Sequence, residues 1–268
     1  MKQSLKTLIK ILIILILYFL TQALVMTVFA AIGGMGAQGD IQGSMESYIA
    51  EKTALISLVH NALIILCLLI YRRKSAAAKE ELSLRPLSAG NTGLCAGLGI
   101  CAAFIVTLLL SLLPIPEEMM SSYISALAEG TAGAPLEKLL SVAIFAPIAE
   151  ELLFRGVIYG SFKRTSRRFI AIAASCALFG LMHQNPIWII YAFLMGLGLT
   201  LTLDAYGTLL APIILHMAFN FTGAYIMPLI EGIPIYIIII LAAALGHTFA
   251  RLIRRMINHK NAPQGDKN

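Results

Sequence analysis

The stretch SVAIFAPIAEELLFRGVIYG, residues 141–160, decides the fold. It lies in an apolar run near 138–160, long enough for a membrane-spanning helix, which needs about 20 apolar residues. Yet it carries Glu150, Glu151 and Arg155 within six residues. A charge within a span costs roughly 2.5 to 3.5 kcal/mol on insertion scales, so such residues tend to line a bundle interior or a cavity. The stretch therefore predicts a membrane helix with a buried polar site.

Seven further apolar runs flank this one, near 7–31, 53–71, 92–113, 169–183, 187–203, 208–228 and 234–252. The chain is 59% hydrophobic and only 13% charged, with a mean hydropathy of +0.84. A soluble domain carries about 25% charged residues. These values exclude a soluble fold of this length and predict an all-α, polytopic membrane bundle of about eight transmembrane helices with a buried polar active site.

We expect one integral membrane domain over 1–268, because we find no internal repeat, low-complexity tract or soluble insertion. Within it we predict a core that carries the polar site near 138–228, accessory transmembrane helices in 1–137 and a disordered polar tail at 259–268. Residues 116–128 begin with a proline and two acids, which suits a helix start. This segment is either an interfacial helix on the outer surface or a simple connector.

The formal net charge of +6 reflects membrane orientation rather than a nucleic-acid partner. With eight crossings, seventeen of the 20 Lys and Arg residues fall on one side, and only Lys52 and Lys138 fall on the other. The positive-inside rule then predicts a multi-pass protein of the cell membrane with both termini cytoplasmic. The first run is longer than the apolar region of a cleaved signal peptide, so we expect a retained signal-anchor helix.

Helix geometry gives the three charges of the fourth run different partners. At about 100° per residue, Glu151 and Arg155 lie about 40° apart, whereas Glu150 and Arg155 lie about 140° apart. Glu151 can therefore pair with Arg155, and each charge lowers the cost of burying the other. Glu150 has no such partner along its own helix, so we expect its neighbours to come from other helices and its carboxylate to accept a proton. Pro147 predicts a kink just before the glutamates.

Two other runs place a histidine at i, i+4 spacing from a second notable side chain, on one helical face. The fifth run ends SCALFGLMHQNP, with Phe179 and His183, and the seventh contains ILHMAFNF, with His216 and Asn220. A lone histidine in such a run is more often a satisfied core residue, but two polar side chains together favour a function. At about 1.5 Å per residue, these polar groups and Glu150 lie about 12 to 21 Å from the cytoplasmic ends of their runs. That depth is the middle of a hydrocarbon core about 30 Å thick.

Two further histidines, His60 and His247, also lie inside apolar runs. Neither has an acid, an amide or a second histidine at helical spacing. We therefore expect both to be core or interfacial residues rather than members of a site.

Three motifs together resemble the signature of a known family. EELLFR at 150–155, FGLMH at 179–183 and HMAFN at 216–220 are similar to the EExxxR, FxxxH and HxxxN/B motifs of the CPBP intramembrane proteases. This is the CAAX protease and bacteriocin-processing family, also called Abi. It includes type II CAAX prenyl endopeptidases and proteins similar to lysostaphin resistance protein A. Order and spacing fit over about residues 138–228, and the first three helices carry no such resemblance.

The resemblance implies a role for each matched residue. Glu150 would be the catalytic glutamate and general base, taking a proton from water as that water attacks a peptide carbonyl. His183, His216 and Asn220 would complete the site by holding the water or stabilising the oxyanion. The supporting residues would be Glu151, Arg155 and Phe179.

These residues permit two mechanisms. Glu150, His183 and His216 could ligate Zn²⁺ and leave a position open for water, although Glu150 would then have to be both ligand and base. In the alternative, Glu150 activates water without a metal. We favour the metal-free mechanism slightly, because no HExxH helix supplies two ligands together with a separate base.

The implied activity is endopeptidase cleavage of a membrane-embedded or lipid-anchored peptide or protein within the lipid bilayer. The resemblance points to prenylated CAAX proteins in eukaryotic relatives, and to peptide processing, bacteriocin self-immunity or signalling in bacterial ones. Two other classes stay open. A non-catalytic bacteriocin-immunity or membrane scaffold protein could use the polar cluster to lock its helices. A transporter could use Glu150 as a proton site, although we find no paired half-helices or inverted repeat.

Overall fold

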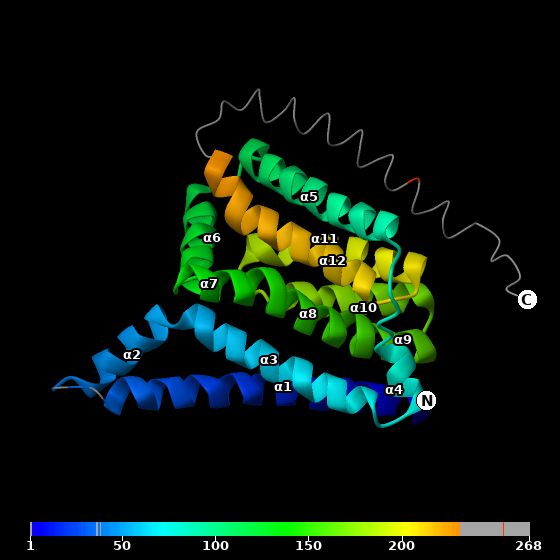
Figure 1. Ribbon diagram of the computed structural model, residues 1–268, viewed down its shortest axis with the longest axis horizontal. Helices are drawn as coiled ribbons and strands as arrows, with labels where there is room; N and C mark the ends of the chain where they lie inside the picture. Colours follow the sequence, from blue (N-terminus) through cyan, green and yellow to red (C-terminus); the bar gives the residue numbers. More distant parts are fainter. Residues whose placement is uncertain (1, 36, 38, 231–253, 255–268) are drawn as a thin grey trace, which may run out of the picture. The chain divides into compact units, whose positions relative to one another are not determined.

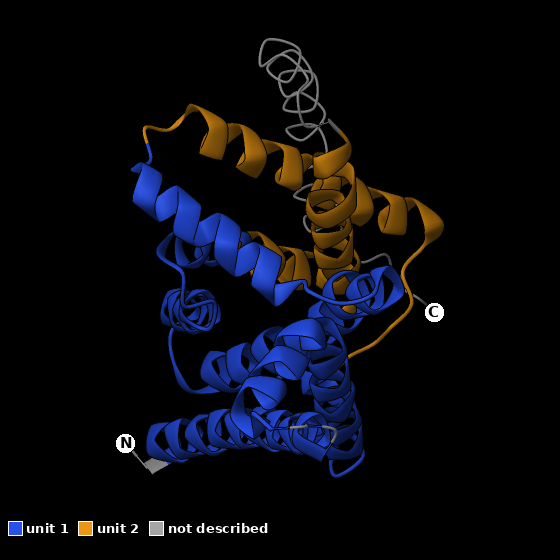
Figure 2. Ribbon diagram, turned by 90° about the vertical axis from the view of Figure 1, so that its left-hand side faces the viewer, with its two compact units in different colours: residues 1–82, 115–196 blue, residues 83–114, 197–268 orange. Residues whose placement is uncertain are grey.

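The computed structural model describes residues 2–35, 37, 39–230 and 254 of the chain (Figure 1). The regular elements within these residues are helices, and none is a strand. The predicted run near 234–252, which holds His247, and the predicted tail at 259–268 lie outside the described residues. The chain divides into two compact units, residues 1–82 with 115–196 and residues 83–114 with 197–268 (Figure 2). The single integral membrane domain stays a prediction.

The first unit begins with α1 (Lys2–Met35), α2 (Ile41–Glu51), α3 (Thr53–Arg72) and α4 (Ala76–Glu81), and α1 lies along α3 (Figure 1). Side-chain caps start two of these helices. Asp40 accepts a hydrogen bond from the Gly43 amide at the start of α2, and Ser75 accepts one from the Ala78 amide at the start of α4. The unit also contains α6 (Glu117–Gly130), α10 (Arg168–Leu181) and the first half of α11 (Pro186–Tyr206).

The predicted fourth run forms one continuous helical stretch at the centre of this unit. It comprises α7 (Pro135–Lys138), η1 (Leu139–Phe145), α8 (Ala146–Glu150), η2 (Glu151–Tyr159) and α9 (Gly160–Thr165), with η1 and η2 in the π conformation. Pro147 lacks an N–H group and its ring crowds the preceding turn. The wider turn ahead of it relieves this crowding, and the Ala146 amide donates to the carbonyl of Ser141. The structure thus has π turns on both sides of α8, of a kind frequent at functional sites, while the kink expected at Pro147 stays a prediction.

The second unit contains α5 (Ala89–Leu112), the second half of α11, α12 (Leu210–Phe221), η3 (Thr222–Ile226) and η4 (Met227–Ile230). Helices α5 and α12 pack along each other (Figure 1). Their backbones touch at Gly99, where an added Cβ would lie only 2.1 Å from the carbonyl oxygen of Leu215. A small residue at this crossing allows the close approach that membrane helices commonly use.

Among the described residues, five helical stretches are long and apolar enough to cross a membrane: Gln3–Met35, Thr53–Arg72, Ala89–Leu112, Pro186–Tyr206 and Leu210–Leu229. Helix α10 is apolar but has only 14 residues. Large apolar side chains such as Leu12 and Leu24 are exposed along α1, which suits contact with lipid. The all-α membrane bundle is confirmed, whereas the count of eight spans and the cytoplasmic position of both termini stay predictions.

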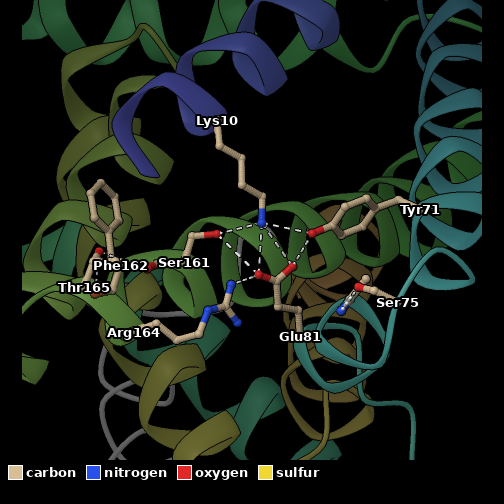
Figure 3. Close-up of polar contacts among 9 residues, drawn as sticks. Lys10, Tyr71, Ser75, Glu81, Ser161, Phe162, Arg164 and Thr165 are labelled. Atoms are coloured by element: carbon tan, nitrogen blue, oxygen red, sulfur yellow. Dashed lines mark hydrogen bonds and ion pairs between the residues drawn. The ribbon is translucent and has the colours of Figure 1, made fainter. Parts of the chain in front are cut away.

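A buried carboxylate fastens α1 to the rest of the first unit (Figure 3). The Lys10 ammonium donates to Glu81 Oε1 at 3.0 Å, to the Tyr71 hydroxyl at 2.9 Å and to Ser161 Oγ at 3.0 Å. The Tyr71 hydroxyl donates to Glu81 Oε2 at 2.7 Å, and Arg164 forms an ion pair with the same carboxylate. This polar lock therefore joins α1, α3, α4 and α9.

Candidate active site

The second glutamate of the EELLFR motif forms a sealed ion pair. Arg155 Nη1 donates to Glu151 Oε1 at 2.8 Å, and both side chains are 0% exposed. The pairing expected from helical spacing is confirmed. Each charge compensates the other, so the loss of one partner would strand its counterpart in a buried position. The supporting role of the pair stays a prediction.

The first glutamate, Glu150, has different surroundings. It is the last residue of α8, and its side chain is half-buried. Its carboxylate interacts electrostatically with Tyr18 on α1 and with Tyr191 on α11. Neighbours from other helices were expected, although tyrosines were not. Adjacent carboxylates in different environments can take different chemical roles, and Glu150 is the one with access to more than its own helix.

Phe179 links the buried ion pair to His183. The guanidinium carbon of Arg155 lies 4.1 Å from the centroid of the Phe179 ring, a cation–π contact. The His183 ring packs edge-on against the Phe179 ring, with centroids 5.0 Å apart. The Phe154 ring also packs edge-on against Phe179, with centroids 5.2 Å apart. The i, i+4 contact predicted for Phe179 and His183 is therefore present, and it fixes the position of the imidazole.

The end of α10 also fixes the tautomer of His183. The last carbonyls of a helix have no partner within it, and His183 Nδ1 lies 2.9 Å from one of them, the carbonyl oxygen of Phe179. Because a carbonyl oxygen only accepts, Nδ1 must carry the proton. In the neutral ring, Nε2 then keeps its lone pair, which can accept a hydrogen bond from water or bind a metal.

The turn that follows His183 is held at several points. Gln184 has φ of 62°, in the left-handed region, so the chain reverses sharply here. Asn185 Oδ1 accepts a hydrogen bond from the Ile187 amide at 3.1 Å, which caps the start of α11. On the next turn Trp188 packs against the His183 ring at 5.4 Å. This short turn therefore connects the histidine rigidly to α11.

Helix α6 contacts the same turn. It begins within the segment 116–128, where the sequence suggests a helix start. Asn185 Nδ2 donates to Ser122 Oγ at 3.3 Å. The Tyr123 ring packs edge-on against Trp188 at 6.2 Å and Tyr191 at 6.3 Å, and the hydroxyls of Tyr123 and Tyr191 are hydrogen-bonded. Burial raises the pKa of the Tyr123 hydroxyl, so this group remains protonated near neutral pH. The interfacial position of α6 stays a prediction.

The third motif lies in the second unit. His216 and Asn220 are one turn apart on α12, and His216 is 4% exposed. The close contact between Gly99 and the Leu215 carbonyl lies next to His216 in the sequence and sets how near α12 approaches α5. The helix that carries this motif is therefore positioned by backbone packing.

The first unit gathers five of the seven predicted site residues: Glu150, Glu151, Arg155, Phe179 and His183. His216 and Asn220 belong to the second unit, and their participation in one site stays a prediction.

The donor set expected for Zn²⁺ would draw on both units, with Glu150 and His183 from the first and His216 from the second. Across the part of the chain that the structure describes, no three His, Cys, Asp or Glu side chains form a group able to hold a metal. A metal ion at this site stays a prediction.

Several neighbours of the site were missed from the sequence. Tyr18 and Tyr191 gave no signal, because a tyrosine inside an apolar run is ordinary in a membrane helix. Asn185 did carry a signal, since Asn-Pro directly before an apolar run suits a helix start. A helix start at this point also places Trp188 in the first turn of α11, where it contacts His183.

Comparison with known proteins finds a family that residues 132–222 resemble. They match the family described as "Type II CAAX prenyl endopeptidase Rce1-like". A protein of Lactococcus lactis subsp. cremoris, "UPF0177 protein in abiGi 5'region", is 37% identical over 101 residues. That alignment covers 37% of this chain and 42% of the relative. No solved structure matches the chain significantly.

Proposed function

We propose that the chain is an intramembrane endopeptidase of the CPBP (Abi) type in which Glu150 activates water, because residues 132–222 match the type II CAAX prenyl endopeptidase Rce1-like family. The matched segment holds the EELLFR and FGLMH motifs and His216 and Asn220 of the third. Hydrolysis of a peptide bond in a membrane-associated substrate is the activity that best uses these groups.

The observation that carries this proposal is the difference between the two adjacent carboxylates. Glu151 is sealed and neutralised by Arg155, whereas Glu150 is half-buried and interacts with tyrosines on two other helices. A general base must reach the water whose proton it takes. Of the two glutamates, only Glu150 is partly exposed, and its carboxylate is not the one that pairs with Arg155.

The reaction follows from these groups. Glu150 takes a proton from water as the water oxygen attacks the carbonyl carbon of the scissile bond. The carbonyl oxygen becomes an oxyanion, which hydrogen-bond donors stabilise, and the resemblance assigns His216 and Asn220 to this task. The C–N bond then breaks, and the amine leaves with the proton that Glu150 received. His183, with its proton on Nδ1, presents Nε2 to accept a hydrogen bond from the attacking water.

For the substrate we propose a membrane-embedded or lipid-anchored peptide, cut near one end of its anchor. The description of the matched family names prenylated CAAX sequences. A bacterial peptide or bacteriocin precursor is the alternative substrate within the same activity.

The test is cleavage of a peptide panel by the purified full-length chain in detergent, followed by mass spectrometry. The panel contains a farnesylated CAAX peptide, the same peptide without its lipid, and unmodified transmembrane peptides. Glu150→Ala and His216→Ala are compared with the wild type, each with and without a chelator. We expect both variants to lose cleavage of any peptide that the wild type cuts, and loss on chelation would favour a metal.

Two results would contradict the proposal. Glu150→Ala that cleaves at the wild-type rate would remove the glutamate from the mechanism. A wild type that cuts no peptide, while the same variants keep their function in cells, would favour a non-catalytic immunity or scaffold protein.

A further inference from the structure

His60, which the sequence suggests is an ordinary core residue, has an unusual environment. It lies on α3 and is 4% exposed. Its ring packs edge-on against Tyr18 of α1, with centroids 4.6 Å apart. Among the described residues, neither Nδ1 nor Nε2 has a hydrogen-bond partner. A buried polar atom without a partner destabilises the fold, so two such atoms on one side chain require an explanation.

The neighbouring Asn61 differs from His60 in having a local hydrogen-bond partner. Asn61 is also 4% exposed, but its amide nitrogen donates to the Ser57 carbonyl at 2.9 Å and to Ser57 Oγ at 3.2 Å. These bonds stay within α3 and account for the amide nitrogen, whereas Asn61 Oδ1 has no partner among the described residues. His60 has no such local anchor, and consecutive residues point about 100° apart on a helix.

The surroundings of His60 lead toward the candidate catalytic glutamate. Helix α3 packs on η1 and α8, and α8 ends at Glu150. Tyr18, which touches the His60 ring, also interacts electrostatically with Glu150. His60 and Tyr18 are thus in ring contact, and Tyr18 in turn feels the charge of Glu150, all within the first unit.

We propose that His60 and Tyr18 form a water-binding site that delivers water to Glu150. This inference rests on the proposed hydrolysis, which consumes one water for each bond cut. Water is scarce in the hydrocarbon core, and a buried water needs about three hydrogen-bonding partners. The His60 ring nitrogens and the Tyr18 hydroxyl can supply such partners, on helix α3, which packs on α8, and on Tyr18, which interacts electrostatically with Glu150. His60 is thus a positioning residue that acts through bound water, in a part of the chain outside the matched residues 132–222.

The first test measures the cleavage of whichever panel peptide the wild type cuts. His60→Phe keeps a ring against Tyr18 but removes both nitrogens, and we expect kcat to fall at least about tenfold with KM unchanged. His60→Gln keeps hydrogen-bonding capacity and should recover most of kcat. Tyr18→Phe removes only the hydroxyl and should also lower kcat. Asn61→Leu is the matched control and should leave kcat unchanged.

Thermal unfolding of the same variants separates this role from a structural one. His60→Phe removes two costly buried nitrogens, so its midpoint should equal or exceed that of the wild type. A kcat for His60→Phe within twofold of the wild type would overturn the proposal. So would an equal loss in Asn61→Leu.

A second readout needs no activity. The infrared carboxyl and carboxylate bands of Glu150 can be identified by their loss in Glu150→Gln. They should shift in His60→Phe and stay in place in Asn61→Leu. A shift in a protein that cleaves no peptide would support the water site while the protease proposal fails. Unshifted bands in an active enzyme would reject the water site alone.

Discussion

Gly99→Ala tests whether backbone contact between α5 and α12 positions the third motif. The added Cβ would lie 2.1 Å from the Leu215 carbonyl oxygen and 3.0 Å from the Ala218 Cβ. Both neighbours are held by α12, so the helices must separate locally. Overpacking of this kind costs about 1 to 3 kcal/mol, while alanine regains up to about 1 kcal/mol of helix propensity over glycine. We expect a net loss of about 1 to 2 kcal/mol in the free energy of unfolding.

The matched control is Gly198→Ala, because an added Cβ there meets nothing within 4 Å among the described residues. It should raise the unfolding free energy by up to about 1 kcal/mol through helix propensity alone. Denaturation of the purified proteins in detergent compares the two variants. Since Leu215 precedes His216, Gly99→Ala should also lower kcat more than Gly198→Ala. An unfolding midpoint for Gly99→Ala equal to that of Gly198→Ala would refute the close contact.

Three further substitutions test other parts of the first unit. Glu81→Gln removes the anion between Lys10 and Arg164, so it should lower the unfolding free energy by about 1 to 3 kcal/mol and speed amide exchange in α1, whereas Glu51→Gln, at a 67% exposed carboxylate, should change little. Arg155→Met leaves Glu151 buried without its cation and should cost about 3 to 5 kcal/mol, and Glu151→Leu added to it should restore most of that loss in the same denaturation assay; equal stability of single and double variants would contradict this. Asn185→Ala removes the cap of α11 and should lower the unfolding free energy by about 1 kcal/mol. It should also lower kcat in the cleavage assay, and Ser122→Ala should lower kcat less. An unchanged kcat in Asn185→Ala would show that the turn does not position His183.

Much of the fold could be predicted because a helix that crosses the hydrocarbon core needs a long apolar run. Long apolar runs predict spans, and five of the runs appear as helices long enough to cross a membrane. The pairing of Glu151 with Arg155 also followed from helical spacing, since both residues lie on one continuous helix. The contact of Phe179 with His183 followed in the same way.

What escaped prediction depends on contacts between distant segments. Lys10 reads as an orientation signal and Glu81 as part of a polar connection, yet they meet across 71 residues. His60 reads as a core residue because its environment is set by Tyr18 on another helix. Helical spacing reports only partners on the same helix, so neither contact could be predicted from the local sequence. The π turns around α8 depend on packing as well as on Pro147.

The central claim is that Glu150 activates water while Glu151 does not. The most direct test is kcat for Glu150→Gln on a peptide that the wild type cuts, with folding checked by thermal unfolding. We expect a loss of at least about a hundredfold in kcat, as for removal of a general base, with an unfolding midpoint close to that of the wild type. A folded Glu150→Gln protein that cleaves at the wild-type rate would contradict it.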